Sequence, residues 1–300
     1  MSCLAVLVGR LRRDRTGTLV FTAIDDYTKW LWLVLPIARI FAPRWKILLV
    51  RYRIDDVIDD HKLFGARAKG WLVALVRYLT SATVCCFDER VNKKHYHLLP
   101  DPWSGPFGQF EARVARREYG WNEHDFVIGL IGTQDARKGF DVAVKAMLLL
   151  ADKSVNVCIV GRIEGSQEGC ADRLREAYGE RLTHFDYYVS DDVLAKVMAA
   201  SSVILLPYHS AFSATSGVLS RAAASGTRVI ASEHGLVGWR VRRWELGAVF
   251  RYPDAEELAD KIRAIRRETS YSNAKEFASR STDQALVSSF GSIWIALRDG

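Results

Sequence analysis

Residues 201–239 constrain the fold of this chain more than any other segment. The apolar run Val203–Leu206 is followed by Pro207, by a loop rich in hydroxyl side chains, and by a helix of small residues that Gly226 is expected to end. The next apolar run, Arg228–Ser232, then begins a second strand. This order of strand, loop, helix and strand predicts a parallel βαβ unit.

The loop Ser210–Gly217 of this unit is a candidate phosphate site. Its hydroxyl side chains come directly before the start of the predicted helix. A helix start carries free backbone N–H groups and a partial positive charge, and both attract phosphate. Because the loop follows the carboxyl end of a parallel strand, the segment predicts an anionic ligand at that edge of the sheet.

The same alternation of short apolar runs with helical segments continues along the chain and predicts an α/β fold with two Rossmann-like parallel sheets facing a cleft. Three strands and two helices are expected before a proline-rich linker at 98–106: strands 19–24, 47–51 and 83–87, and helices 26–41 and 66–79. The second series has expected strands at 127–131, 155–160, 203–206, 228–231 and 248–251.

The domain boundaries follow from the linker and from the length of the chain, since 300 residues exceed the usual size of one domain. We expect a first domain at 1–104, short or truncated because only three strands are evident. A second domain is expected at 105–283, and a helix at 284–300 that packs back on the first domain.

The excess positive charge is confined to the first third of the chain. Residues 1–105 hold 17 lysines and arginines against 10 acidic residues, whereas residues 106–300 hold 25 of each. Aromatic residues are interleaved with the basic ones from Lys29 to Arg53. Two interpretations stay open: contact with an anionic membrane surface, or a solvated basic face beside buried tryptophans. Nucleic acid is not expected as a partner, because no nucleic-acid-binding signature accompanies the charge.

The cysteines and the apolar segments predict the compartment. The five cysteines lack CxxC spacing, which is typical of a reducing compartment and of a chain without a zinc site. The acidic residues Asp55, Asp56, Asp59 and Asp60 are interpreted as a solvated acidic segment rather than a metal site. The apolar stretch 30–43 is too short to span a bilayer. We therefore expect a cytoplasmic protein, with peripheral membrane contact as the open alternative.

A second motif lies between Ile128 and Asp141. A strand leads to Gly132, a short polar loop, and then Arg137 and Lys138 beside the start of a helix. Two fixed cations at a helix start are suitable partners for a diphosphate.

Together the two motifs resemble the donor-binding domain of GT-B glycosyltransferases of family 4, the glycosyl transferases group 1. In that family a strand leads to G-R-x(4)-K-G-x-D and later to P-S-x(2)-E-G-x-G-x(3)-L-E-A-x-A-x-G-x-P-V-I. Here the first pattern runs from Gly132 to Asp141 and the second from Ser213 to Ile230. The resemblance covers residues 126–250 and is weak before residue 100.

The resemblance implies a retaining, metal-independent glycosyltransferase that takes a nucleoside diphosphate sugar as donor and needs no cofactor. It implies catalytic roles for Lys138 and Arg137 on the leaving diphosphate. The expected donor-binding residues lie in the two motifs: Gly132, Thr133, His209, Ser213, Thr215, Ser216, Gly217, Val218 and Arg221. The acceptor is expected to be an unknown sugar, a lipid-linked molecule or another small molecule.

Three departures from the family pattern leave an alternative open. Thr133 replaces an arginine, and Ser213 and Arg221 replace two glutamates. An arginine cannot accept hydrogen bonds from a ribose. The alternative is a GT-B scaffold that binds a phosphorylated ligand or a protein partner without transferring a sugar. A dinucleotide-dependent enzyme is disfavoured, because no GxGxxG motif opens either series of strands.

Overall fold

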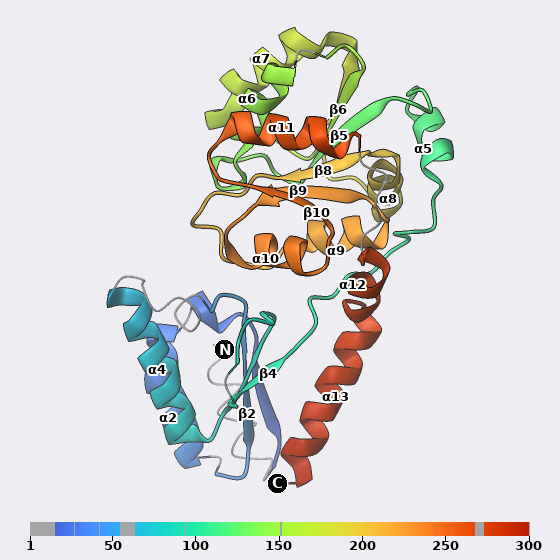
Figure 1. Cartoon of the computed structure of the whole chain (residues 1–300). Coiled ribbons are helices and arrows are strands. Elements are labelled where there is room, and N and C mark those ends of the chain that lie inside the picture. The colour runs from blue at the N-terminus through green and yellow to red at the C-terminus, as the bar shows by residue number, and fades with distance from the viewer. Residues whose placement is uncertain are drawn as a thin grey trace. The chain divides into compact units, whose positions relative to one another are not determined.

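The computed structural model describes residues 16–26, 28–41, 43–54, 64–92, 94–150, 152–267 and 273–299. The chain forms two compact units, each with its own parallel sheet (Figure 1). Unit 1 holds residues up to Pro100, Ser213–Thr215, and the residues from Leu286 onward. Unit 2 holds Asp101–Phe212 and Ser216–Ala285. The acidic residues between 55 and 60 lie outside the described residues.

Unit 1 is a four-stranded sheet in the order β1-β2-β3-β4, with every neighbouring pair parallel. Its elements are β1 (Thr18–Phe21), η1 (Ile24–Asp26), α2 (Thr28–Phe41), β2 (Lys46–Arg51), α4 (Phe64–Thr80), β3 (Thr83–Cys86), β4 (Tyr96–Leu98) and most of α13 (Asp283–Asp299). The predicted strands and helices of this region are present. The prediction missed β4, because its three residues at a sheet edge, one half-buried and two exposed, carry no alternating pattern.

The two faces of this sheet are covered by different helices. On one face Leu31 and Leu35 of α2 and Val73 and Val76 of α4 pack against alternate strand residues such as Leu49. On the other face α13 packs against Leu48, Val50 and Cys85. The packing residues of α13 recur along one face of that helix: Leu286, Phe290, Ile293 and Leu297.

Asp25 of η1 is paired with cations and with backbone donors. Its carboxylate pairs with Arg51 at 3.3 Å and with Lys69 at 3.3 Å, and it accepts hydrogen bonds from the backbone N–H groups of Tyr52 and Arg53. Arg51 is fully buried and also donates to the hydroxyl of Tyr96. Asp25 is therefore the centre of a buried ionic network that joins η1 to the end of β2.

Unit 2 is a six-stranded parallel sheet in the order β10-β9-β8-β5-β6-β7, with helices on both faces. Its strands are β5 (Phe126–Ile131), β6 (Val155–Val160), β7 (Leu182–Phe185), β8 (Val203–Leu206), β9 (Arg228–Ser232) and β10 (Gly247–Phe250). Its helices are α5 (Ala112–Glu118), η2 (Ala136–Lys138), α6 (Phe140–Leu150), η3 (Gly165–Gln167), α7 (Glu168–Tyr178), η4 (Gly179–Arg181), α8 (Asp191–Ala200), α9 (Gly217–Ala224), α10 (Gly235–Arg243), α11 (Ala255–Ile265) and α12 (Ala274–Arg280).

Two helices of unit 2 begin at side-chain caps. Ser190 accepts a hydrogen bond from the N–H of Val193 and opens α8. Asp254 accepts from the N–H of Glu257 at 2.9 Å and opens α11. In a capping box the carboxylate of Glu257 would accept from the N–H of Asp254, but here it accepts from the N–H of Arg251.

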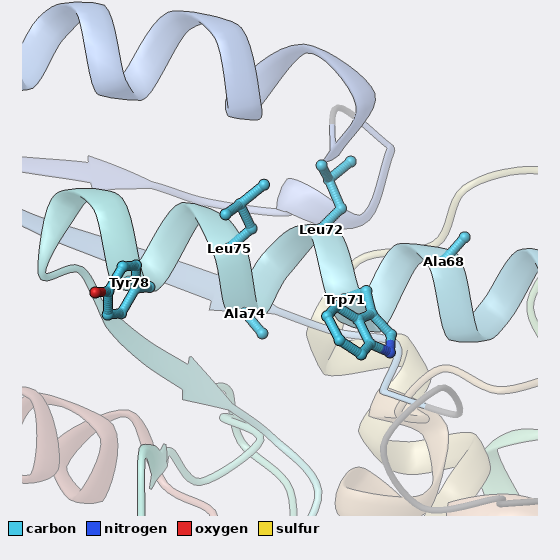
Figure 2. Close-up of a pocket in the computed structure, with 6 residues that line it drawn as sticks. All are labelled: Ala68, Trp71, Leu72, Ala74, Leu75 and Tyr78. Atoms are coloured by element: carbon cyan, nitrogen blue, oxygen red, sulfur yellow. The ribbon is translucent and has the colours of Figure 1, made fainter.

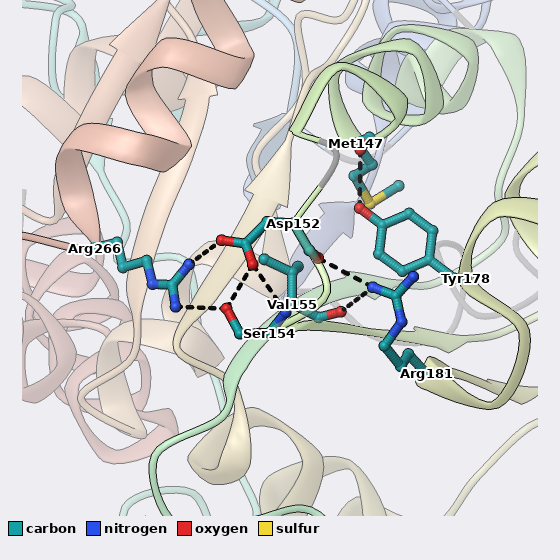
Figure 3. Close-up of polar contacts among 7 residues, drawn as sticks. All are labelled: Met147, Asp152, Ser154, Val155, Tyr178, Arg181 and Arg266. Atoms are coloured by element: carbon teal, nitrogen blue, oxygen red, sulfur yellow. Dashed lines mark hydrogen bonds and ion pairs between the residues drawn. The ribbon is translucent and has the colours of Figure 1, made fainter.

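The segment before β6 is held by two arginines (Figure 3). Arg266 pairs with Asp152 and donates to the hydroxyl of Ser154 at 2.7 Å. Arg181 donates to the carbonyls of Asp152 and Val155 at 3.0 and 3.1 Å. These contacts fix the chain as it enters β6 and place that strand beside β5.

Candidate functional site

The strand order of unit 2 reverses between β5 and β8. From β5 the chain continues to β6 and β7 on one side, whereas β8 lies on the other side and leads to β9 and β10. In open α/β sheets, ligands bind beyond the carboxyl ends of the strands at such a reversal. Both motifs found in the sequence follow these two strands, so they meet at the expected place.

Lys138 lies directly over the carboxyl end of β5. Asp135 opens the short helix η2 and accepts a hydrogen bond from the N–H of Lys138 at 2.7 Å. The ammonium of Lys138 then turns back and donates to the carbonyl of Ile131 at 3.3 Å. Gly132 makes room for it, since a Cβ at that residue would collide with the ammonium, and its φ of 91° favours glycine.

The electrostatic surroundings of Lys138 follow from this position. Burial lowers the pKa of Lys138, the carboxylate of Asp135 opposes that effect, and Arg137 adds to it. The sequence analysis did not select Asp135. Its spacing of three residues before Lys138 is a cap pattern that could have identified it.

The turn between β5 and α6 packs on the end of β8. Gly139 has a φ of 67°, and a Cβ there would collide with the carbonyl oxygen of Pro207. The N–H of His209 donates to the carbonyl of Arg137 at 3.0 Å. These contacts hold the two loops together at the reversal point.

The start of α9 is fixed by a buried pair of hydroxyls. Ser216 is the N-cap of the helix, and its Oγ lies 2.9 Å from the hydroxyl of Tyr208. Burial raises the pKa of Tyr208 to about 12, so this hydroxyl stays protonated at neutral pH. The amides of Gly217 and Val218 follow in the first turn, where a helix leaves N–H groups for a ligand.

Arg221 folds back over this helix start. Its Nη1 donates to the carbonyl of Gly217 at 3.4 Å, and its guanidinium lies 5.6 Å from the centre of the Phe107 ring. Among the residues that the structure describes, its buried Nε has no hydrogen-bond partner. Arg221 therefore adds a positive charge to the start of α9, at the position where the resembled family has a glutamate.

A pocket of about 420 Å³ opens between these elements. Four of the predicted donor-site residues line it: Gly132, Thr133, Val218 and Arg221. The remaining lining residues come from β5, β6 and the segment between β7 and α8: Ile131, Val160, Gly161, Arg162, Tyr187, Tyr188, Val189, Asp191 and Leu194. This last segment was not predicted, because it follows β7, a half-buried edge strand that carries no apolar run in the sequence and whose carboxyl end leads to the two tyrosines.

Other predicted site residues lie outside the lining of this pocket. Arg137 is exposed, pairs with Asp135 at 3.3 Å and lies 5.9 Å from the centre of the Phe212 ring. The Nδ1 of His209 accepts from the N–H of Ala211 at 3.0 Å, so its ring closes a local turn. Ser213 and Thr215 are grouped with unit 1 and stay predictions.

The described residues form neither a metal-binding cluster nor a membrane-spanning helix. Within the described ranges, no three His, Cys, Asp or Glu side chains converge as a metal site. No helix in the described part of the chain is both long and apolar enough to cross a membrane.

Comparison with known families bears on unit 2. Residues 125–268 match the family model described as Glycosyl transferases group 1. Over these residues unit 2 is similar to a glycosyl transferases group 1 domain. The match lies on the strands and loops that build the pocket, and it confirms the resemblance found in the sequence. Comparison with curated proteins gives no match.

Solved structures place the group 1 domain in a GT-B fold. HepE of Anabaena in complex with UDP has a TM-score of 0.73 at 16% identity, covering 99% of this chain and 82% of its own. Sucrose-phosphate synthase of Thermosynechococcus elongatus has a TM-score of 0.58 at 16% identity, covering 95% and 100%. WaaG, a glycosyltransferase of lipopolysaccharide biosynthesis, has a TM-score of 0.55 at 14% identity, covering 90% and 98%. These likenesses confirm the predicted α/β fold with two Rossmann-like parallel sheets.

Proposed function

We propose that this chain transfers a sugar, with retention of configuration, from a nucleoside diphosphate sugar to an acceptor that is lipid-linked or a small molecule. One observation carries the proposal: Gly132, which lies against the ammonium of Lys138, lines one pocket together with Val218 and Arg221 of α9 at the reversal point of the sheet. Structures of similar fold were solved with UDP and with UDP-glucose, which supports a diphosphate donor.

The chemistry requires stabilisation of the leaving group. The bond between the anomeric carbon and the diphosphate breaks, and an acceptor hydroxyl oxygen replaces the diphosphate on that carbon. Negative charge then grows on the departing diphosphate. Lys138, Arg221 and the first amides of α9 are fixed before the reaction begins, and fixed charges and dipoles of this kind are the largest source of rate acceleration in many enzymes.

The nucleoside half of the donor is assigned to the other end of the pocket. Tyr187 and Tyr188 offer aromatic rings against which a base stacks. Asp191 supplies a carboxylate that accepts hydrogen bonds from ribose hydroxyls, a role that Arg221 cannot take. In this assignment Asp191 replaces the missing glutamate of the family pattern.

The site of action is proposed to be the cytoplasm. The described cysteines Cys85, Cys86, Cys158 and Cys170 are all free thiols. Free thiols are typical of reducing compartments.

Calorimetric titration with UDP, GDP and ADP tests the donor site. We expect micromolar binding of one nucleotide, weakened at least about tenfold, or about 1.4 kcal/mol, in Lys138→Ala. The matched control is Lys145→Ala on α6, whose ammonium is exposed and pairs with Asp141 at 3.6 Å. Absence of binding to all three nucleotides would overturn the proposal.

A transfer assay then separates the two candidate functions. Release of the nucleotide from its sugar donor in the presence of acceptor, lost in Lys138→Ala, supports transfer, and NMR of the product gives its anomeric configuration. Tight nucleotide binding without release under any acceptor would favour the binding scaffold over the enzyme.

A further inference from the structure

Helix α4 exposes a stripe of large apolar side chains (Figure 2). Trp71 and Tyr78 are 80% and 81% exposed, and Leu75 between them is 46% exposed. Their spacing of four and three residues places them on one face of the helix. The opposite face holds Val73 and Val76, which are buried in the core of unit 1. The exposed aromatics are therefore not needed to hold α4 on its sheet.

The stripe forms a shallow apolar groove of about 550 Å³. All the residues that line it belong to α4: Ala68, Trp71, Leu72, Ala74, Leu75 and Tyr78. A polar ligand finds few hydrogen-bonding groups in such a groove, because the only polar atoms on these side chains are the indole N–H and the phenol hydroxyl. The groove suits an apolar or amphipathic surface rather than a soluble metabolite.

The neighbouring helix α2 also exposes apolar residues. Helix α2 packs against α4, and its Trp30, Ile37 and Ile40 are all exposed to solvent. Two adjacent helices of unit 1 thus leave large apolar side chains uncovered. Exposed apolar area on this scale marks an interaction surface in a folded protein.

The charge of the two helices identifies the kind of partner. Residues 28–41 and 64–80 contain no aspartate or glutamate, but they contain Lys29, Arg39, Arg67, Lys69 and Arg77. Lys69 pairs with Asp25, and Arg39 donates to the carbonyl of Trp45. Arg77, half-buried, precedes Tyr78 on α4. A surface that combines basic residues with tryptophan and tyrosine matches the interface of an anionic bilayer.

We propose that the α4 surface, defined by Trp71, Leu75 and Tyr78, docks unit 1 on an anionic lipid bilayer. The aromatic rings lie at the level of the lipid headgroups, and basic side chains of the same helices beside the stripe, such as Arg77, attract the lipid phosphates. A second copy of this chain fits the surface less well, because two surfaces of the same charge repel each other. The inference stands apart from sugar transfer, since it uses no residue of the pocket in unit 2.

This location overlaps only in part with the one that the sequence indicated. The basic and aromatic mixture was expected between Lys29 and Arg53, where the structure exposes Trp30 but buries Trp45 and Arg51. Trp45 fits the alternative of buried tryptophans beside a basic face. The exposed aromatic residues of α4 follow that segment in the chain.

Vesicle flotation of the full chain tests the inference. We expect the protein to float with vesicles of phosphatidylcholine and phosphatidylglycerol in a ratio of about 7:3 and to remain mostly unbound with phosphatidylcholine alone. Trp71→Ser combined with Tyr78→Ser is expected to reduce the partition coefficient at least about tenfold. Arg77→Glu is expected to reduce it by about tenfold.

Two control variants outside α4 test whether the effects are specific to the α4 surface. Trp294→Ser on α13 removes another exposed tryptophan, and Arg173→Glu on α7 makes the same change in net charge on another exposed helix. Both controls are expected to float like the parent. Unchanged thermal unfolding of the Trp71 and Tyr78 variant is the check that its fold is intact.

Two results would overturn the inference. One is failure of the parent chain to float with the anionic vesicles. The other is a Trp71 and Tyr78 variant that floats like the parent. If the parent does not float and the variant instead changes the oligomeric state measured by light scattering, the surface joins copies of the chain and the bilayer is excluded.

Discussion

At the scale of single residues, Lys138 is a cation in surroundings that disfavour its charge. Its folded pKa is lowered chiefly by burial, so the charged form costs stability at neutral pH, and that cost falls as pH rises from the folded pKa to the ordinary pKa of lysine. A bound diphosphate supplies the opposite charge and raises the pKa again. Nucleotide binding is therefore coupled to the protonation of this side chain.

This coupling predicts a pH dependence of binding. Affinity for the bound nucleotide is expected to fall as pH rises through the pKa of Lys138, at a pH below that at which an ordinary lysine titrates. Calorimetry across the alkaline range measures the slope. The Lys138→Ala variant shows the part of the slope that comes from the nucleotide itself, so parallel slopes for parent and variant would contradict the prediction.

Gly139 provides a second prediction at this scale. Gly139→Ala introduces a Cβ against the carbonyl oxygen of Pro207 at a φ of 67°, and we expect a loss of about 2–4 kcal/mol in the free energy of unfolding. Urea unfolding measures it. The control is Gly169→Ala on α7, where a Cβ meets nothing within 4 Å. Equal stabilities of the two variants would show that the turn moves away from β8 without cost.

At the scale of elements, Arg181 joins the end of α7 to the entry of β6. Its guanidinium donates to the carbonyls of Asp152 and Val155 (Figure 3). It also donates to the carbonyl of Ala177 and lies 4.7 Å from the centre of the Tyr178 ring. Arg181→Ala leaves these carbonyls without that donor. We expect a loss of about 1–3 kcal/mol in thermal or urea unfolding, against almost none for the exposed Arg173→Ala. Equal effects of the two substitutions would contradict a specific role.

The strands also differ in how well they can be predicted from the sequence. Strands of four to six buried residues, such as β5, β6 and β8, were predicted because an apolar run is visible without any partner. The edge strands β4 and β7 were missed. Their residues are half-buried or exposed, and only pairing with β3 and β6 makes them strands.

At the scale of the whole molecule, the last helix of the chain, α13, packs in the core of unit 1, which is built mainly from the first hundred residues. Ile293 of α13 is buried against Leu48, Val50 and Cys85. Ile293→Ala is expected to destabilise unit 1 by about 2–5 kcal/mol, because it leaves a cavity in that core. Calorimetric unfolding in the presence and absence of UDP measures the stability of each of the two units.

The same variant tests where the nucleotide binds. Because the candidate pocket lies within unit 2, Ile293→Ala should leave nucleotide affinity unchanged. The exposed Ile295→Ala is the control and should change neither quantity. A loss of nucleotide affinity in Ile293→Ala would show that the donor site depends on the core of unit 1.

The sequence by itself determined the parallel α/β series, the caps at Ser190 and Asp254, and the two loops that bring Lys138 and the start of α9 to one sheet edge. These are local patterns, in which spacing along a few residues decides the structure. Only the tertiary structure decided what lies around them. It added Asp191 and the two tyrosines to the pocket, buried Arg51 against Asp25, and left Trp71 exposed on α4. Burial and pairing of this kind depend on segments far apart in the chain, and no local pattern records which segments will meet.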